Sequence, residues 1–275
     1  MRLGIGILGW NRPYYLIETL RALRDNDLTD CDAHLFQDGA VCRVTGAVRA
    51  EARDIEADVA VFRAMLPGGT IHQHEQRVGI AENRLAQLGY LSEHYDLWLA
   101  LEDDVVVSSQ YVALMRNLLE DWAGRDNVGA FSSPLWAEQA VQERLGYHVS
   151  ERPNGPVSVL ATRTPWFAPV LDRFRQYCEV IRPYEYRDGW PEYQTAVRQL
   201  FGGQNIVVSS NGALIWAFQA SGRRLWGVVS TRAITLGRDG THMTPEIYQR
   251  VGYAAGVVHQ HPEELAVPFV DATPL

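Results

Sequence analysis

Three consecutive acids, Glu102, Asp103 and Asp104, interrupt an apolar stretch of this 275-residue chain between Leu97–Leu101 and three valines. Two unit charges about 4 Å apart repel by roughly 4 kcal/mol at a partly buried site. This acidic triplet therefore either faces solvent and caps the next turn, or is compensated by a bound cation, which is the natural compensation at the tip of an apolar strand. Carboxylate oxygens without nearby Cys select a hard ion such as Mg²⁺ or Mn²⁺, which keeps positions open for water and phosphate oxygens.

Alternating strands and helices precede the acidic triplet. Residues 3–8 are expected to form a strand, and Pro13 then fits the first turn of a helix, where it costs no hydrogen bond. The other expected elements are strands at 33–36 and 58–62, a helix over 79–91 and a strand from Leu97. This order is typical of an open, mostly parallel sheet flanked by helices.

Polar turns follow three of the predicted strands, at residues 9–13, 37–39 and 102–104. In open α/β sheets, ligands bind beyond the carboxyl ends of the strands. We therefore expect these three turns to converge on one cleft.

The second half of the chain has a looser pattern. Its expected elements are a helix from Ser108 to about Trp122, a strand at 128–131, a polar loop at 152–156, and helices near 165–181, 190–201 and 211–220, the last closed by Gly222. Trp and Tyr are concentrated in this half. Such residues suit a surface that stacks on sugar rings, and they are also ordinary core material.

Composition excludes several classes of function. A hydrophobic content of 47% supports a substantial core. The net charge of −8 argues against nucleic acid or an anionic membrane as the main partner. No segment approaches the ~18 apolar residues of a transmembrane helix. Three cysteines, Cys31, Cys42 and Cys178, form no paired metal-ligand spacing and suit a reducing compartment, so a cytoplasmic location is expected.

The acidic triplet and four further segments resemble, in their joint order, GT-A fold nucleotide-sugar-dependent glycosyltransferases, and within that fold the N-acetylglucosaminyltransferase I type. The further segments are the Asn11-Arg12 turn, Gln37-Asp38, His74 five residues before Gly79, and STRAITLGRDGTHM at 230–243. The resemblance covers residue 3 to about 243. It implies a single α/β domain with a GT-A, Rossmann-like fold and an acceptor-side extension. Residues 1–107 would bind the nucleotide-sugar donor and residues 108–275 the acceptor.

The resemblance implies a role for each matching residue. Asp104 would hold a divalent metal, Mn²⁺ or Mg²⁺, under the donor diphosphate, with Glu102 and Asp103 near the sugar and the ribose. The other implied donor contacts are Arg12, Asp38, His74 and, in the loop that closes over the donor, Arg238; His242 is a further candidate metal ligand. Taken singly, the residues outside the triplet could be ordinary turn or surface residues. Asn83 and Arg84, on the helix before the triplet, suit structural capping as well as donor contact.

The catalytic base is less clearly marked. Inverting transfer needs a carboxylate that takes the proton of the acceptor hydroxyl. In the resembled family this acid precedes the C-terminal loop, at a position that is Asn211-Gly212 here, and neither residue can act as a base. The nearest substitutes are Asp188, our candidate base, and Glu192, the alternative, which flank Trp190 at a predicted helix start. A helix N-terminus also recruits acids for purely structural reasons.

The sequence therefore predicts a metal-dependent glycosyltransferase. It would move a hexosyl or N-acetylhexosaminyl group, with inversion, from a UDP-sugar to a sugar or a glycosylated small molecule. A sugar-phosphate nucleotidyltransferase would share the sheet and the acidic metal site, but LGWNRP lacks the Gly-rich loop of that class. A non-catalytic sugar-binding relative is the third possibility, which Asn211 keeps open.

Overall fold

The computed structural model describes residues 2–133, 149–151, 157–185, 189–202, 208–228, 232–238 and 244–250. Strands and helices alternate in its first part: β1 (Leu3–Gly9), α1 (Pro13–Arg24), β2 (Cys31–Gln37), α2 (Ala52–Met65), β3 (Thr70–Gln73), α3 (Ile80–His94), β4 (Leu97–Leu101), β5 (Val105–Val107) and α4 (Tyr111–Asp121).

The remaining elements are β6 (Val128–Ser133), β7 (Val149–Glu151), β8 (Val159–Arg163), α6 (Thr164–Ile181), α7 (Trp190–Leu200), α8 (Ser210–Ala220), β9 (Arg224–Val228), β10 (Ala233–Thr235) and α9 (Pro245–Arg250). The helices predicted near 165–181, 190–201 and 211–220 are thus confirmed, and Gly222 follows α8 with a positive φ of 67°. The polar loop predicted at 152–156 lies outside the described residues. Among the described helices, none is long and apolar enough to cross a membrane.

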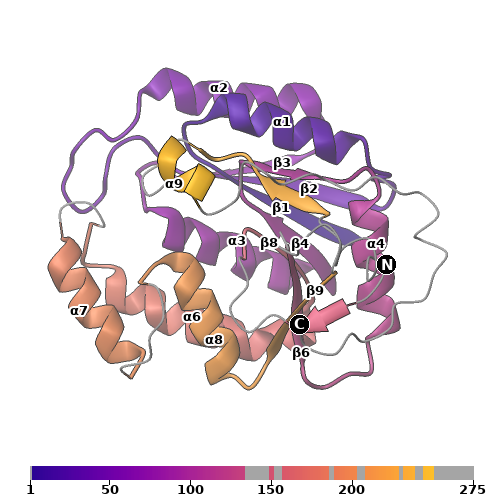
Figure 1. Cartoon of the computed structure of the whole chain (residues 1–275). Helices are drawn as coiled ribbons and strands as arrows, with labels where there is room; N and C mark the ends of the chain where they lie inside the picture. The colour runs from indigo at the N-terminus through magenta and orange to yellow at the C-terminus, as the bar shows by residue number, and fades with distance from the viewer. Residues whose placement is uncertain are drawn as a thin grey trace.

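One mixed sheet runs through both halves of the chain, in the order β3-β2-β1-β4-β8-β6-β9-β7 (Figure 1). Strands β3, β2, β1 and β4 are parallel, and β8 runs antiparallel to both β4 and β6. Every residue of β1 and β4 is buried, as expected for central strands covered on both faces. The predicted α/β fold, with a mostly parallel sheet flanked by helices, is confirmed.

Two apolar cores cover the two faces of the sheet. One contains residues of α1, α2 and α4, and the other contains residues of α3, α6, α7 and α8. Figure 1 shows α1 and α2 above the sheet and α3, α6 and α8 below it. The carboxyl ends of β1, β2 and β4 are therefore held in place from both sides.

The strand predicted at residues 58–62 is wrong, because this segment belongs to α2. Ile55, Val59 and Phe62 recur at helical spacing and are buried on the same face of α2. The third strand is β3, which follows the Pro67-Gly68-Gly69 break. A short apolar run is compatible with either a helix or a strand. Here the spacing of the apolar residues from Ile55 to Phe62 indicates the helix.

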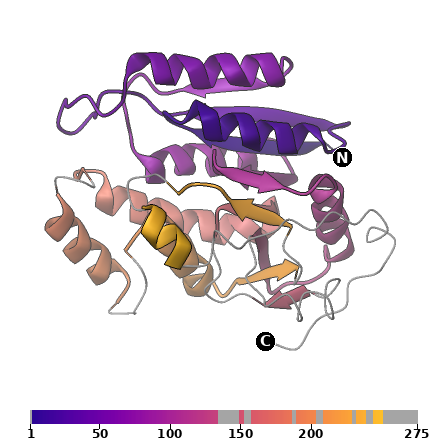
Figure 2. The ribbon, with the colours of Figure 1, turned by 45° about the horizontal axis from the view of Figure 1, so that its top comes forward.

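The valines after the acidic triplet do not continue β4. They form β5, which pairs antiparallel with β10 in a separate two-stranded sheet. Figure 2 shows this pair of strands, which joins the middle of the chain to its C-terminal part. The acidic triplet therefore lies at a junction between two sheets.

A buried histidine on β2 makes folding stability depend on pH. The Nε2 atom of His34 lies 2.7 Å from the Tyr95 hydroxyl, and its Nδ1 atom lies 3.2 Å from Nε2 of His72. Burial, together with the charges of His72 and His94, lowers the pKa of His34 to about 4, and Asp32 opposes the shift.

We expect His34 to weaken the fold in acid. The unfolded chain takes up a proton near pH 6.5 that the folded chain refuses until about pH 4. The contribution of His34 to the free energy of unfolding is therefore complete above pH 6.5. It is lost as the pH falls toward 4, by up to about 1.4 kcal/mol per pH unit. Urea unfolding at pH 7.5, 6.0 and 5.0 measures this slope against His34→Gln. Equal slopes in the two proteins would contradict the prediction.

Candidate functional site

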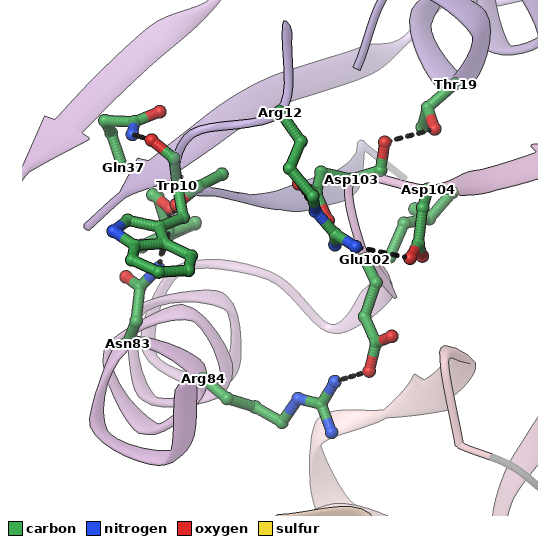
Figure 3. A network of polar contacts seen from close by, with 12 residues as sticks. Trp10, Arg12, Thr19, Gln37, Asn83, Arg84, Glu102, Asp103 and Asp104 are labelled. Atoms are coloured by element: carbon green, nitrogen blue, oxygen red, sulfur yellow. Dashed lines mark hydrogen bonds and ion pairs between the residues drawn. The ribbon is translucent and has the colours of Figure 1, made fainter. Parts of the chain in front are cut away.

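The three polar turns predicted to converge do meet at the carboxyl edge of the sheet. The main-chain N–H of Asp38, after β2, donates to the carbonyl of Gly9 at the end of β1 (2.9 Å). The side-chain amide of Gln37 donates to the carbonyl of Trp10 (2.6 Å). The side chain of Arg12 reaches across to the acidic triplet after β4 (Figure 3).

Arg12 binds two members of the acidic triplet. Its Nε atom donates to Oδ2 of Asp103 (3.1 Å), its Nη2 atom donates to Oδ1 of the same carboxylate, and its Nη1 atom lies 3.1 Å from Oδ2 of Asp104. Burial opposes the charge of Arg12, but Asp103 and Asp104 raise its pKa, so the guanidinium stays protonated. A planar fork of this kind matches carboxylate geometry better than an ammonium does.

The third acid, Glu102, turns away from the other two. Its Oε1 atom accepts a hydrogen bond from Nη2 of Arg84 on α3, as Figure 3 shows. The backbone around the triplet is also anchored, because the Thr19 hydroxyl donates to the carbonyl of Asp103 (2.7 Å). Two arginines therefore compensate part of the charge for which the sequence suggested a bound cation.

Asp104 remains incompletely compensated. Three carboxylates face two guanidinium groups, which leaves one negative charge in excess. The Oδ1 atom of Asp104 is buried and has no hydrogen-bond partner among the described residues. Burial raises the pKa of Asp104 to about 7, with Asp103 and Glu102 acting in the same direction and Arg12 against it. An additional cation would relieve this cost.

These residues fit a divalent metal that is held jointly with a ligand. In the described part of the chain, no three His, Cys, Asp or Glu side chains are grouped as a complete metal site. Mg²⁺ commonly uses only one or two protein carboxylates and takes its other ligands from water and phosphates. The unpaired Oδ1 of Asp104 suits that arrangement. The other candidate ligand, His242, lies outside the described residues.

The segment after β10 lies directly against Asp104. The main-chain N–H of Leu236 donates to the carbonyl of Asp104 (2.7 Å). A Cβ atom added to Gly237 would lie 2.0 Å from Oδ2 of Asp104 and 3.4 Å from Nη1 of Arg12. Glycine is therefore required for this close approach. The candidate Arg238 follows it, with an exposed side chain.

Gly237→Ala should displace this segment, because the new methyl group cannot share space with the Asp104 carboxylate. We expect a loss of about 1–3 kcal/mol in the free energy of unfolding, as for other overpacked sites. Gly124→Ala is the matched control, since nothing lies within 4 Å of the added Cβ there. Urea unfolding of both variants checks the prediction, and equal stabilities would show that the segment tolerates the methyl group.

Asp38 holds the loop before α3. Its Oδ1 atom accepts from the main-chain N–H groups of Gly39 (2.9 Å) and Val78 (2.7 Å), and its Oδ2 atom accepts from that of Gly79 (3.0 Å). Burial raises the pKa of Asp38, and these hydrogen bonds oppose the shift. The structure therefore gives Asp38 a clear role in holding the backbone, while its contact with the nucleobase of the donor stays a prediction. His74 is placed nearby by a main-chain bond to the carbonyl of Gln37 (3.0 Å).

Arg84 joins the acidic triplet to the first turn of α8. Its Nη1 atom donates to Oδ1 of Asn211, while Nη2 donates to Glu102. Asn211, which the sequence predicts to lie near the position of the resembled family's acid, is therefore a neutral partner of an arginine beside the acidic triplet. Sequence reasoning considered a structural role for Arg84 but did not connect it with Asn211, because 127 residues separate the two.

The two candidate bases are not brought to the triplet by any described contact. Asp188 lies outside the described residues. Glu192 is exposed on α7, where it lines a groove of about 360 Å³ with Tyr184, Pro191 and Thr195. This groove includes no member of the acidic triplet. The role of either acid therefore stays a prediction.

Sequence reasoning missed a further buried acid, Asp58. Its side chain is fully buried on α2 near Arg12, Gln37 and Asp103. Burial raises its pKa to about 7 and the charge of Asp103 adds to the shift, whereas the main-chain N–H of Arg12 and the amide of Gln37 oppose it. Neither group completes a hydrogen bond of good geometry with Asp58. An acid on the apolar face of α2, between Ile55 and Phe62, was the available signal.

One aromatic residue at the site, Trp10, comes from the first half of the chain. Trp10 follows β1, its indole N–H donates to the carbonyl of Gly39 (3.1 Å), and the guanidinium of Arg77 lies 4.8 Å from its ring centre. By contrast, many aromatic residues of the second half are core residues, among them Trp166, Tyr177 and Trp216. Their number is explained by packing and does not by itself indicate a sugar-binding surface.

The fold is shared with a solved protein structure. A crystal structure of S. aureus TarS 1–349 matches with a TM-score of 0.51 and 10% identity, over 86% of this chain and 61% of that one. This likeness shows the fold alone, and the chain spans less than two thirds of the TarS structure.

Two other solved structures are similar at lower TM-scores. Mannosyltransferase PcManGT from Pyrobaculum calidifontis, in complex with GDP-Man and Mn²⁺, has a TM-score of 0.41 and 12% identity over 72% of this chain and 51% of that one. Galactosyltransferase LgtC, in complex with donor and acceptor sugar analogs, has a TM-score of 0.38 and 12% identity over 78% of this chain and 70% of that one. Neither adds to the fold assignment. No protein-family model and no curated protein matches the chain.

Proposed function

We propose that this protein is a metal-dependent glycosyltransferase that takes a sugar from a nucleoside diphosphate sugar, with a UDP-sugar favoured, and transfers it to a sugar-containing acceptor. The observation that carries the proposal is Asp104, whose buried Oδ1 has no hydrogen-bond partner among the described residues and lies beyond the carboxyl ends of the central strands. In α/β sheets this is where ligands bind. TarS 1–349, whose fold is similar, has also been crystallised with UDP and with UDP-GlcNAc, which supports this choice of donor.

The acidic triplet and its arginines would bind the donor. Asp104 would hold Mn²⁺ or Mg²⁺, and the bound ion would neutralise charge on the departing diphosphate. Asp103 would approach the ribose, Glu102 the sugar and Asp38 the nucleobase, and His74 would lie at the nucleotide. Arg12 favours the ionised forms of Asp103 and Asp104 and orients both carboxylates. Arg238, next to Gly237, would contact the donor.

The transfer step would proceed with inversion. The oxygen of the acceptor hydroxyl forms the new bond to the anomeric carbon, the bond from that carbon to the diphosphate breaks, and its electron pair leaves with the nucleotide. Asp188 would take the hydroxyl proton as the general base, and Glu192 is the alternative. Asp188→Asn should then abolish turnover and leave nucleotide binding intact, whereas near-normal turnover would remove Asp188 from this role.

A second candidate function is sugar binding without catalysis. The observation that favours it is Asn211, a neutral side chain engaged by Arg84 where the resembled family has its base. Release of UDP from a panel of UDP-sugars, with Mn²⁺ and a broad panel of acceptors, separates the two functions. Donor binding without release would support the second.

The donor site is tested most directly by thermal stability. UDP, GDP, CDP and dTDP are each added with and without Mn²⁺, because a ligand of the native state raises stability by mass action, by about 2.7 kcal/mol at a hundredfold excess over Kd. We expect UDP with Mn²⁺ to raise the melting temperature most. If no nucleoside diphosphate shifts the melting temperature even with metal, the proposal fails.

A further inference from the structure

A single buried guanidinium joins α3, the end of β4 and the start of α8. Arg84 has a side chain that is only 3% exposed, and it donates through Nη2 to Glu102 and through Nη1 to Asn211. The heads of Glu102 and Asn211 are therefore held side by side on one rigid planar group. Both side chains remain partly accessible.

The orientation of the Asn211 amide follows from this contact. A guanidinium has only hydrogen-bond donors, so the amide must turn its oxygen toward Arg84. Its NH₂ group consequently points away from Arg84, and it has no partner in the described part of the chain. The backbone of this turn is fixed as well, because Ser209 caps α8 by accepting from the N–H of Gly212 (3.0 Å).

Holding Arg84 does not account for an asparagine at position 211. A carboxylate would pair more strongly with a buried guanidinium than a neutral amide does. What the amide adds is a fixed NH₂ group beside Glu102, whose second oxygen, Oε2, is not taken up by Arg84. The pair offers one hydrogen-bond donor and one acceptor at neighbouring positions.

The chemistry of this pair selects its ligand. The carboxylate of Glu102 would repel a phosphate, and its side chain points away from Asp103 and Asp104 (Figure 3). A group bound here must therefore be neutral and able both to accept and to donate hydrogen bonds. Two adjacent hydroxyl groups of a sugar meet these requirements.

We propose that Asn211, oriented by Arg84, is a specificity residue for the donor sugar, and that its NH₂ group donates to a sugar hydroxyl next to the one bound by Glu102. This inference rests on the proposed function. Arg84 acts here as a positioning residue, since it reaches the sugar only through its two partners.

The test compares the binding of UDP with that of UDP-glucose, UDP-galactose and UDP-N-acetylglucosamine by calorimetry with Mn²⁺. Asn211→Leu removes the NH₂ group, and Asn211→Asp replaces it with an acceptor while keeping an oxygen for Arg84. We expect both variants to change the ratio of affinities among the three UDP-sugars by about tenfold, the effect of about one hydrogen bond. The affinity for UDP should stay within about twofold, because UDP lacks the sugar.

Asn117→Asp is the matched control. It makes the same chemical change at an exposed residue of α4 and should leave every affinity unchanged. If Asn211→Leu does not fold, Asn211→Asp alone decides the question. Unaltered ratios among the UDP-sugars in the Asn211 variants would overturn the inference while the donor site stands. If the wild-type protein binds no UDP at all, the proposed function fails, and the inference fails with it.

Discussion

Asp104→Asn should abolish the effect of Mn²⁺ on nucleotide binding and lower turnover by about a hundredfold or more, because a metal held by Asp104 would supply several kcal/mol of charge stabilisation. The amide keeps the shape of the side chain and its contact with Arg12. It removes the excess negative charge and the unpaired carboxylate oxygen that suit a cation. Thermal shifts with UDP, with and without Mn²⁺, and rates of UDP release measure the two effects.

The same variant, although it should lose activity, is expected to make the ligand-free protein more stable. The folded-state pKa of Asp104 is raised to about 7 from an ordinary value near 3.8, so wild-type stability is lost as pH rises through this interval. At pH 8, Asp104→Asn should therefore be more stable than the wild type, and the difference should disappear below about pH 4. Asp121→Asn, an exposed change on α4, should alter neither Mn²⁺-dependent nucleotide binding nor the stability at pH 8. Mn²⁺-dependent UDP binding that survives in Asp104→Asn would remove Asp104 from the metal site.

Arg12→Met should lower the free energy of unfolding by about 3 kcal/mol near neutral pH. The change leaves the carboxylates of Asp103 and Asp104 buried without their cation, and removing one partner of a buried ion pair typically costs about 3–5 kcal/mol. Part of the loss should return when Mn²⁺ is added, because the metal can replace the guanidinium as a counter-charge. Urea unfolding with and without Mn²⁺ measures both quantities.

The control for Arg12 is an ion pair of the same kind at the surface. Arg175 and Asp172 lie 2.8 Å apart on α6, with side chains 50% and 70% exposed. Arg175→Met should therefore change stability by less than about 1 kcal/mol. Arg12→Lys keeps the charge without the fork and should fall between the wild type and Arg12→Met. A loss in Arg12→Met no larger than in Arg175→Met would show that the acidic triplet does not depend on Arg12.

Local patterns in the sequence predicted the framework of the site. The apolar run before Glu102 predicted β4, and Pro13 marked the start of α1. Strand–helix alternation then placed the polar turns at one edge, since parallel strands all end on the same side. The segment assigned to the wrong element, residues 58–62, was a short apolar run whose pattern is compatible with both a strand and a helix.

The distant partners of the site could not be predicted from the sequence. Asn211 binds Arg84 across 127 residues of sequence. Gly237 lies against Asp104, and no local sequence pattern around either residue indicates that contact. Asp58 was hidden by the assignment of its segment to a strand. Each of these contacts depends on how helices and strands pack, which periodicity does not specify.

By itself, the sequence determined that three acids would end a buried strand among other polar turns, because the order of apolar and polar residues sets where strands stop. Only the tertiary structure decided which positively charged side chain compensates each carboxylate. It paired Asp103 with Arg12 and Glu102 with Arg84, and it left Asp104 with one buried oxygen that has no partner within the described ranges. The physical reason is that ion pairing depends on distance and desolvation, and packing sets both. The acids are adjacent in sequence, but folding gives each a different environment.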